Sequence, residues 1–271
     1  MHICPIIDII PDFIMKNTLS FLLLLLSRLC MAQQYESEKV TYLNEDGKHT
    51  KEKDAVIIEQ RLKLDDTLWE FNTYTPNGPR IKSLQSRDEN GKTWNGRYAT
   101  YDRKGNIQAS GNYKMGNKEG TWYIYTPADR ILKEQFYVDG KIVWQKDSTR
   151  MNAERDSTAK NDSIARDGKP LVEVEAAFPG GERGWAQYLN VNMKYPDKAI
   201  RNNIKGSVIV LFVVDTTGHI PLEQVLLERS VEYSMDKEAL QIILSSPAWT
   251  PATREGKPLK VYKKQPFVFT F

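Results

Sequence analysis

The sequence predicts an α+β fold in two parts: an all-β domain of repeated hairpins, then a small antiparallel sheet packed on two helices. Glycine and aromatic positions recur at one spacing within residues 61–145, whereas the periodicity alternates between helix and strand within residues 169–271. Residues 146–168 are polar and charged, and they lack the apolar surface that would offset the entropy of ordering them. They are predicted to form a linker, and residues 33–60 a lead-in to the repeats.

Residues 1–32 have the pattern of a signal segment. A short basic start at Met15 is followed by an apolar run within residues 19–26 and by a small-residue cleavage pattern ending at Ala32. We expect translation to start at Met15 and export to the periplasm. A retained membrane anchor is less favoured because the run is shorter than the ~20 residues that span a bilayer. A lipoprotein is also less favoured, because large residues precede Cys30.

Residue types needed for catalysis or metal binding are sparse. The three histidines, His2, His49 and His219, have no metal-ligand spacing. Both cysteines, Cys4 and Cys30, lie in the signal segment. A net charge of +3 is too small and too dispersed to favour nucleic acid. We predict no catalytic residue, no cofactor or metal site, no nucleic-acid partner and no enzymatic activity.

The repeat in the first domain has a period of 24 residues. Six positions define it: Gly96, Tyr98, Tyr101, Ile107, Tyr113 and Gly116 recur as Gly120, Trp122, Tyr125, Ile131, Tyr137 and Gly140. Aromatic and β-branched residues alternate with polar ones and are broken by Met115-Gly116 and Asp139-Gly140, which suit two-residue hairpin turns. Each copy is predicted to be a β-hairpin, and the copies must share a core because one hairpin alone is marginal.

This pattern, Gly-x-Tyr/Trp-x-x-Tyr followed by a glycine turn and a second strand, resembles MORN-like repeats, in the variant found in antitoxin-type bacterial proteins. The resemblance covers residues 61–145 and implies an interaction scaffold. The alternative, that the repeated rings only form the core of a β-meander, stays open.

The C-terminal domain is predicted to run in the order α, β, β, α, β. Trp185, Tyr188 and Leu189 have the spacing of a short helix after Gly184. Pro196 suits the first position of a second helix, where its missing N–H costs nothing.

The strands of this domain follow the two helices. Residues 207–214 are apolar on both alternating faces, which predicts a strand covered on both sides. A turn at 215–218 leads to a returning strand at 222–227. Ser234 is predicted to cap a third helix, and residues 259–271 form the last strand.

Several short motifs occur in order along this domain: Lys194-Tyr195-Pro196, Ile204-Lys205-Gly206-Ser207-Val208, Asp215-Thr216-Thr217-Gly218, Trp249-Thr250-Pro251-Ala252 and Lys257-Pro258. Together they resemble the C-terminal domain of TonB-type energy transducers, in the form common among Bacteroidetes, over residues 169–271. The ordered combination is specific, whereas any one motif would be weak. The resemblance implies that the last strand accepts a short peptide of an outer-membrane transporter by β-augmentation.

The partner-binding residues that the resemblance implies lie before the second helix and along the last strand: Tyr195, Pro196, Val261, Lys263, Gln265, Phe267 and Phe269. Alternate residues of that strand would share one face, and Pro266 withholds one donor at the edge. Two alternatives stay open: Tyr195 and Pro196 only start a helix, and the phenylalanines belong to the core.

The resulting hypothesis is a periplasmic TonB-like protein that binds transporter peptides and supports energy-dependent transport across the outer membrane. Against direct transduction, neither a transmembrane helix nor the family's proline-rich stretch is evident. The alternative is an envelope-organising scaffold that binds cell wall or envelope proteins, and a third hypothesis is a repeat-type antitoxin or immunity protein. Beyond outer-membrane transporters, candidate partners are an inner-membrane proton-driven motor complex, the cell wall and a second copy of the chain.

Overall fold

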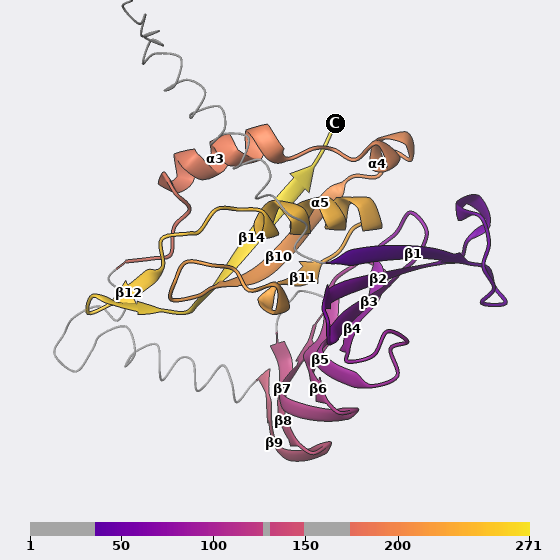
Figure 1. Ribbon diagram of the computed structural model, residues 1–271, viewed down its shortest axis with the longest axis horizontal. Coiled ribbons are helices and arrows are strands. Elements are labelled where there is room, and N and C mark those ends of the chain that lie inside the picture. The colour runs from indigo at the N-terminus through magenta and orange to yellow at the C-terminus, as the bar shows by residue number, and fades with distance from the viewer. Residues whose placement is uncertain (1–35, 127–130, 149–173) are drawn as a thin grey trace, which may run out of the picture. The chain divides into compact units, whose positions relative to one another are not determined.

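The computed structural model describes residues 36–126, 131–148 and 174–271 (Figure 1). The predicted signal segment and most of the predicted linker lie outside these ranges. A nine-stranded sheet is followed by an α+β region with a three-stranded sheet, as the sequence predicts. None of the helices within these ranges is long and apolar enough to cross a membrane.

The N-terminal sheet is a meander in which every strand pairs antiparallel with its neighbour in sequence. Its strands are β1 (Ser37–Leu43), β2 (Ile57–Asp65), β3 (Leu68–Tyr74), β4 (Arg80–Ser86), β5 (Trp94–Tyr101), β6 (Ile107–Lys114), β7 (Asn117–Tyr125), β8 (Ile131–Val138) and β9 (Lys141–Asp147). A short 3-10 helix, η1 (Glu52–Asp54), lies between the first two. Strand β1 and the start of β2 fall in the segment 33–60, so the sheet extends further toward the N-terminus than the repeats.

The 24-residue repeat is visible in the pairing of the strands. Gly96 pairs with Tyr113 in the first copy, and Gly120 pairs with Tyr137 in the second. The turn at Met115 and Gly116 has φ values of 49° and 84°, which matches a two-residue hairpin with positive φ at both positions. Each copy is therefore a hairpin, as predicted.

The repeated aromatic residues divide between the two faces of the sheet. Tyr98, Tyr113 and Trp122 contact one another, with ring centroids 5.2 to 5.6 Å apart. Gly111 makes room for them, because a Cβ at that position would lie 2.3 Å from the Trp122 ring. Tyr101 is buried on the other face, where its hydroxyl donates to the carbonyl of Leu227 in the C-terminal region at 2.9 Å.

The C-terminal region contains two sheets and three α-helices within the described ranges. Its elements are α3 (Gly181–Asn192), α4 (Asp197–Arg201), β10 (Gly206–Val214), η2 (Leu222–Gln224), β11 (Leu226–Arg229), α5 (Tyr233–Leu244), β12 (Ala252–Arg254), β13 (Lys257–Leu259) and β14 (Val261–Phe269). The three-stranded sheet has the order β11-β10-β14, and β12 pairs with β13 in a small hairpin. The elements α3, β10, β11, α5 and β14 follow the predicted α, β, β, α, β order. Helix α4, also predicted, precedes β10, and the β12–β13 hairpin precedes β14.

Several predicted ends and caps were wrong. Helix α3 begins before Gly184, because Gly180 in the left-handed conformation turns the chain into it. Pro196 is the cap residue of α4 rather than its first helical residue. Helix α5 is capped by Glu232, whose carboxylate accepts from the Ser234 N–H at 2.8 Å. The longer carboxylate side chain reaches this N–H from one residue before the helix.

Two predicted strands are also shorter than expected. The segment 222–227 begins as the 3-10 turn η2, and only Leu226–Arg229 pairs with β10. The segment 259–271 divides between β13, which turns back on β12, and β14. Both differences lie where a short turn interrupts an apolar pattern.

The two regions share one hydrophobic core. Ala99, Tyr101 and Ile107 of the N-terminal sheet belong to the same buried cluster as Phe212 and Met235 of the C-terminal region. The N-terminal sheet is therefore packed against the C-terminal region, and the site must be considered with both present.

Candidate functional site

Strand β14 is one edge of the three-stranded sheet. It pairs with β10 over nine residue pairs, from Gly206 with Phe269 to Val214 with Val261. No strand of the described part of the chain pairs with its other side. An edge of this kind presents backbone N–H and C=O groups that another chain can pair with.

The two faces of β14 differ in exposure. Phe267 and Phe269 are only 2% and 1% exposed and lie in the shared core. Tyr262 and Val268 on the opposite face are 78% and 62% exposed. Val261, Lys263 and Gln265 are half-buried on the same face as the two phenylalanines.

The predicted site residues on β14 therefore fall into two groups, those that pack in the core and those that a partner can reach. The phenylalanine side chains hold β14 against the core, which is the alternative that the sequence left open. Lys263 pairs with Glu175 at 3.7 Å between Nζ and Oε2. Gln265 Nε2 donates to the carbonyl of Pro266 at 2.9 Å. Contact with a partner through this face is therefore limited to the three half-buried residues.

Tyr195 and Pro196 lie near the C-terminal end of β14. The Tyr195 hydroxyl donates to the carbonyl of Ile204 at 2.6 Å, and its ring stacks on Phe271 with centroids 5.0 Å apart. The same ring meets Phe269 edge-on at 5.5 Å. Tyr195 thus fixes the segment before α4 to the end of the strand, and Pro196 caps that helix.

A groove opens beside this end of β14. It has a volume of about 340 Å³ and is lined by Leu189 and Met193 of the α3 end, by Tyr195, and by Val268 and Phe269 of β14. Its lining is mostly apolar, and it borders the strand edge. A residue of an added strand could place an apolar side chain there.

The opposite edge of the same sheet, at β11, is covered by the N-terminal sheet. Asn106 forms an antiparallel bridge with Arg229, and the Ser230 N–H donates to the carbonyl of Gly105 at 2.9 Å. We call this contact of the β5–β6 turn with the end of β11 the edge clasp. Sequence reasoning missed it, because the glycine at 105 has the pattern of an ordinary hairpin turn.

The edge clasp continues into a buried polar cluster. The Ser230 hydroxyl accepts from the Arg80 N–H at 2.7 Å and donates to Asp236 Oδ2 at 2.5 Å. Asp236 is fully buried, and burial raises its pKa to about 6 despite the opposing charge of Arg80. Arg80 donates from Nε and Nη2 to the Tyr74 hydroxyl at 2.9 and 2.6 Å.

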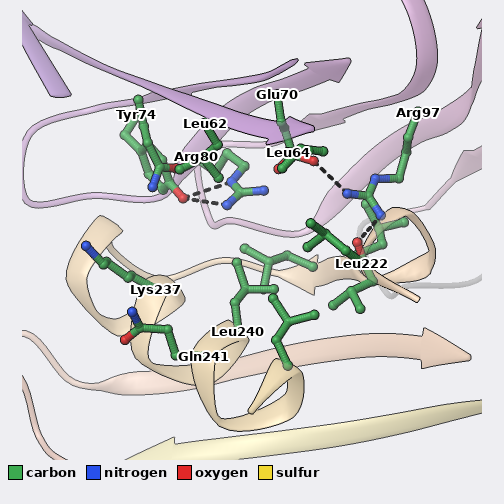
Figure 2. Close-up of a pocket in the computed structure, with 15 residues that line it drawn as sticks. Leu62, Leu64, Glu70, Tyr74, Arg80, Arg97, Leu222, Lys237, Leu240 and Gln241 are labelled. Atoms are coloured by element: carbon green, nitrogen blue, oxygen red, sulfur yellow. Dashed lines mark hydrogen bonds and ion pairs between the residues drawn. The ribbon is translucent and has the colours of Figure 1, made fainter. Parts of the chain in front are cut away.

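A second polar pair, Glu70 on β3 and Arg97 on β5, faces the C-terminal region from either side of β4 (Figure 2). Arg97 Nη2 lies 2.7 Å from Glu70 Oε2, and its Nη1 donates to the carbonyls of Glu223 and Val225. Burial works to raise the pKa of Glu70, but the charges of Arg97 and Arg80 outweigh it and hold that pKa below its usual value. The pair therefore ties the sheet to the turn before β11 as an ion pair.

Figure 2 also shows the cavity that lies between these groups and the leucines of η2 and α5. Its volume is about 40 Å³, which has room for a few water molecules and not for a cofactor. Within the described ranges, no group of three or more acidic, histidine or cysteine side chains could hold a metal ion.

Comparison with known proteins identifies the second region. Residues 191–271 match the family model described as Gram-negative bacterial TonB protein C-terminal. Members of this family are non-enzymatic energy transducers that interact with outer-membrane receptors in the cell envelope. The N-terminal sheet has no assigned family. No curated protein matches the chain, and no solved structure does.

Proposed function

Because residues 191–271 match the TonB C-terminal family, we propose that the chain is a periplasmic TonB-like protein that binds outer-membrane transporters. A short extended segment of the transporter adds to the β14 edge as a fourth strand of the sheet. The observation that carries this proposal is the one-sided pairing of β14. No catalysis is involved.

The closed β11 edge supports binding at β14. Since the edge clasp occupies the end of β11, the C-terminal sheet offers one long edge for pairing. Pro266 has no N–H to donate, so its position restricts the registers that an added strand can take. The chain then binds one transporter segment at a time.

Side chains on both faces of β14 contribute to the proposed contact. Tyr262 and Val268 meet the outward-facing residues of the added strand, because both are largely exposed. Lys263 and Gln265 border the opposite face, and Tyr195 lines the groove at its end. Phe267 and Phe269 do not contact the added strand, and they hold β14 in place by packing in the core.

The repeats are proposed to be a MORN-like interaction scaffold, and the first 32 residues a signal segment. The N-terminus of the protein from the native envelope distinguishes two versions of the proposal. A chain that begins at Gln33 in the soluble periplasmic fraction supports a binding adaptor. An intact N-terminus in the inner membrane supports a transducer that is itself coupled to a proton-driven motor.

Strand addition can be tested with synthetic peptides that tile the periplasmic N-terminal segments of outer-membrane transporters from the same cell. Fluorescence anisotropy measures their binding to the full chain. A binding peptide is then resynthesised with one backbone N-methyl group at each position in turn. We expect affinity to fall roughly tenfold at alternate positions only, because every second N–H of an added strand faces the edge.

Two variants provide the matched control for this experiment. Tyr262→Asp places a negative charge beside the β14 edge and should weaken peptide binding. Ile142→Asp introduces the same charge on exposed β9 and should leave peptide binding unchanged. Failure of every peptide to bind, or equal tolerance of N-methylation along a bound peptide, would rule out strand addition at β14.

A further inference from the structure

We propose that the outward face of β1–β4 is a second binding site, which takes an acidic oligosaccharide. A cleft of about 520 Å³ lies on this face, within the range typical of ligand pockets. Arg61 and Phe71 line the cleft, whereas their sequence neighbours Leu62 and Glu70 line the cavity toward the C-terminal region. The cleft and the β14 edge are therefore separate sites.

The lining of the cleft is mainly polar, and a few apolar side chains lie among the polar ones. Phe71 on β3 pairs with Arg61 on β2 and with Leu84 on β4, so the three side chains form one row across the sheet. Trp94 adds an aromatic wall at the start of β5. Rings and aliphatic groups in such a row suit the C–H face of a sugar ring.

Cationic side chains surround these apolar ones. Lys39 and Arg61 pair across β1 and β2, and Lys82 lies on β4 beyond Thr73. Among the described residues, neither of these lysines forms an ion pair. The cleft is also lined by two carboxylates, those of Glu59 and Glu89. The three cations outnumber the two carboxylates, and this excess beside Phe71 and Trp94 favours a ligand that carries carboxylates.

The walls of the cleft are formed before any ligand binds. The Asp88 carboxylate holds the β4–β5 loop by accepting from the backbone N–H groups of Asn90 at 3.0 Å and Lys92 at 3.2 Å. Arg61 is fixed by donating to the carbonyl of Glu89 at 2.8 Å and by lying over the Trp69 ring. A preformed site avoids the entropy of ordering these groups on binding.

The position of the cleft favours a sugar over a peptide. It lies on the face of a sheet, where the backbone N–H and C=O groups already pair within the sheet. An extended peptide would leave its own backbone groups unpaired there. Sugar hydroxyls can instead reach the Thr41 and Thr73 hydroxyls and the Asn90 amide, which line the same cleft.

The test is isothermal titration calorimetry of the full chain with three probes at low salt. The probes are the tetramer of galacturonic acid, the neutral tetramer of galactose and tetraglutamate. We expect the acidic sugar to bind at least roughly tenfold more tightly than either of the others, because only it combines carboxylates with an apolar sugar face. Equal binding of tetraglutamate would show that charge alone is recognised and would overturn the proposal.

Variants locate the binding site. Lys39→Gln combined with Lys82→Gln should weaken binding of the acidic tetramer roughly tenfold or more. Lys114→Gln combined with Lys141→Gln changes the net charge equally outside the cleft and should leave it unchanged. The proposal fails if the acidic tetramer does not bind, or if both double variants weaken it alike. Peptide binding at β14 should be unaffected by either pair.

Discussion

Gly105 and Ser230 lie so close together that a Cβ at position 105 would be 1.9 Å from the Ser230 carbonyl oxygen. Gly105 also has a φ of 82°. Glycine is therefore required here for two reasons: there is no space for a Cβ, and the backbone is in the left-handed region. The close approach joins the β5–β6 turn to the end of β11, at a separation in sequence of more than a hundred residues.

Substitution Gly105→Ala should therefore lower the free energy of unfolding by about 3 kcal/mol or more, because it adds a clash to the strain of positive φ. Gly116→Ala is a matched control. Its φ is 84°, and a Cβ there meets nothing within 4 Å, so only the strain of about 1–2 kcal/mol applies. Urea unfolding measures both, and equal losses would contradict the edge clasp.

Loss of Arg97 should also be costly. Arg97→Ala leaves Glu70 buried without its ion-pair partner and removes the donor to the carbonyls before β11. We therefore expect the free energy of unfolding to fall by about 3–5 kcal/mol. Lys63→Ala breaks a more exposed pair with Glu36 and should lower the free energy of unfolding much less. Chemical denaturation of both variants provides the comparison. Similar small losses would mean that Arg97 does not tie the regions together.

The pH dependence of stability should report on Asp236. Its pKa in the folded protein is about 6, above the ordinary value of 3.8, so the folded state holds this proton more tightly than the unfolded state. The stability contributed by protonation is present at low pH and is lost as pH rises from about 4 through 6. A rise of about two units in the pKa of Asp236 corresponds to at most about 3 kcal/mol of unfolding free energy.

Asp236→Asn removes this titration. The difference in unfolding free energy between variant and parent should therefore shift in favour of the variant as pH rises from about 4 to 7, and then level off. Other carboxylates, such as Glu70 with its lowered pKa, contribute equally to the pH dependence of both proteins, so their contribution cancels in this difference. A difference that stays flat across this range would show that Asp236 titrates with an ordinary pKa.

The two faces of β14 should separate stability from binding. Phe267→Ala removes a buried ring and should cost about 3–5 kcal/mol. Tyr262→Ala changes a largely exposed side chain and should alter stability by no more than about 0.5 kcal/mol while weakening a transporter peptide. Thermal unfolding together with anisotropy distinguishes them. A Tyr262→Ala protein that binds as tightly as the parent would place the contact elsewhere on the edge.

Local patterns predicted much of this fold. The 24-residue recurrence identified the hairpins at Gly116 and Gly140 because turn geometry depends on neighbouring residues alone. The alternation along residues 261–269 likewise placed Phe267 and Phe269 on one face. In the C-terminal region, the family motifs supported the order of elements and lie largely within the matched residues 191–271.

Long-range contacts could not be predicted in this way. Arg80 and Glu70 are charged residues on strands, and nothing near them in sequence indicates that they are buried against another region. Their burial depends on partners such as Ser230 and on Arg97, which charge patterns within one segment cannot identify. The same limit applies to the cleft, whose lining comes from five strands and two loops.

The meander order of the nine-stranded sheet has a consequence for the order of folding. Each strand pairs with its neighbour in sequence, so the chain closes only short loops to form the sheet. The bond from Tyr101 to Leu227 joins residues 126 apart and must close a much longer loop. We expect the sheet to form first and to dock afterwards. Until docking, β11 is a second open edge, and crowding during this interval would favour pairing between chains.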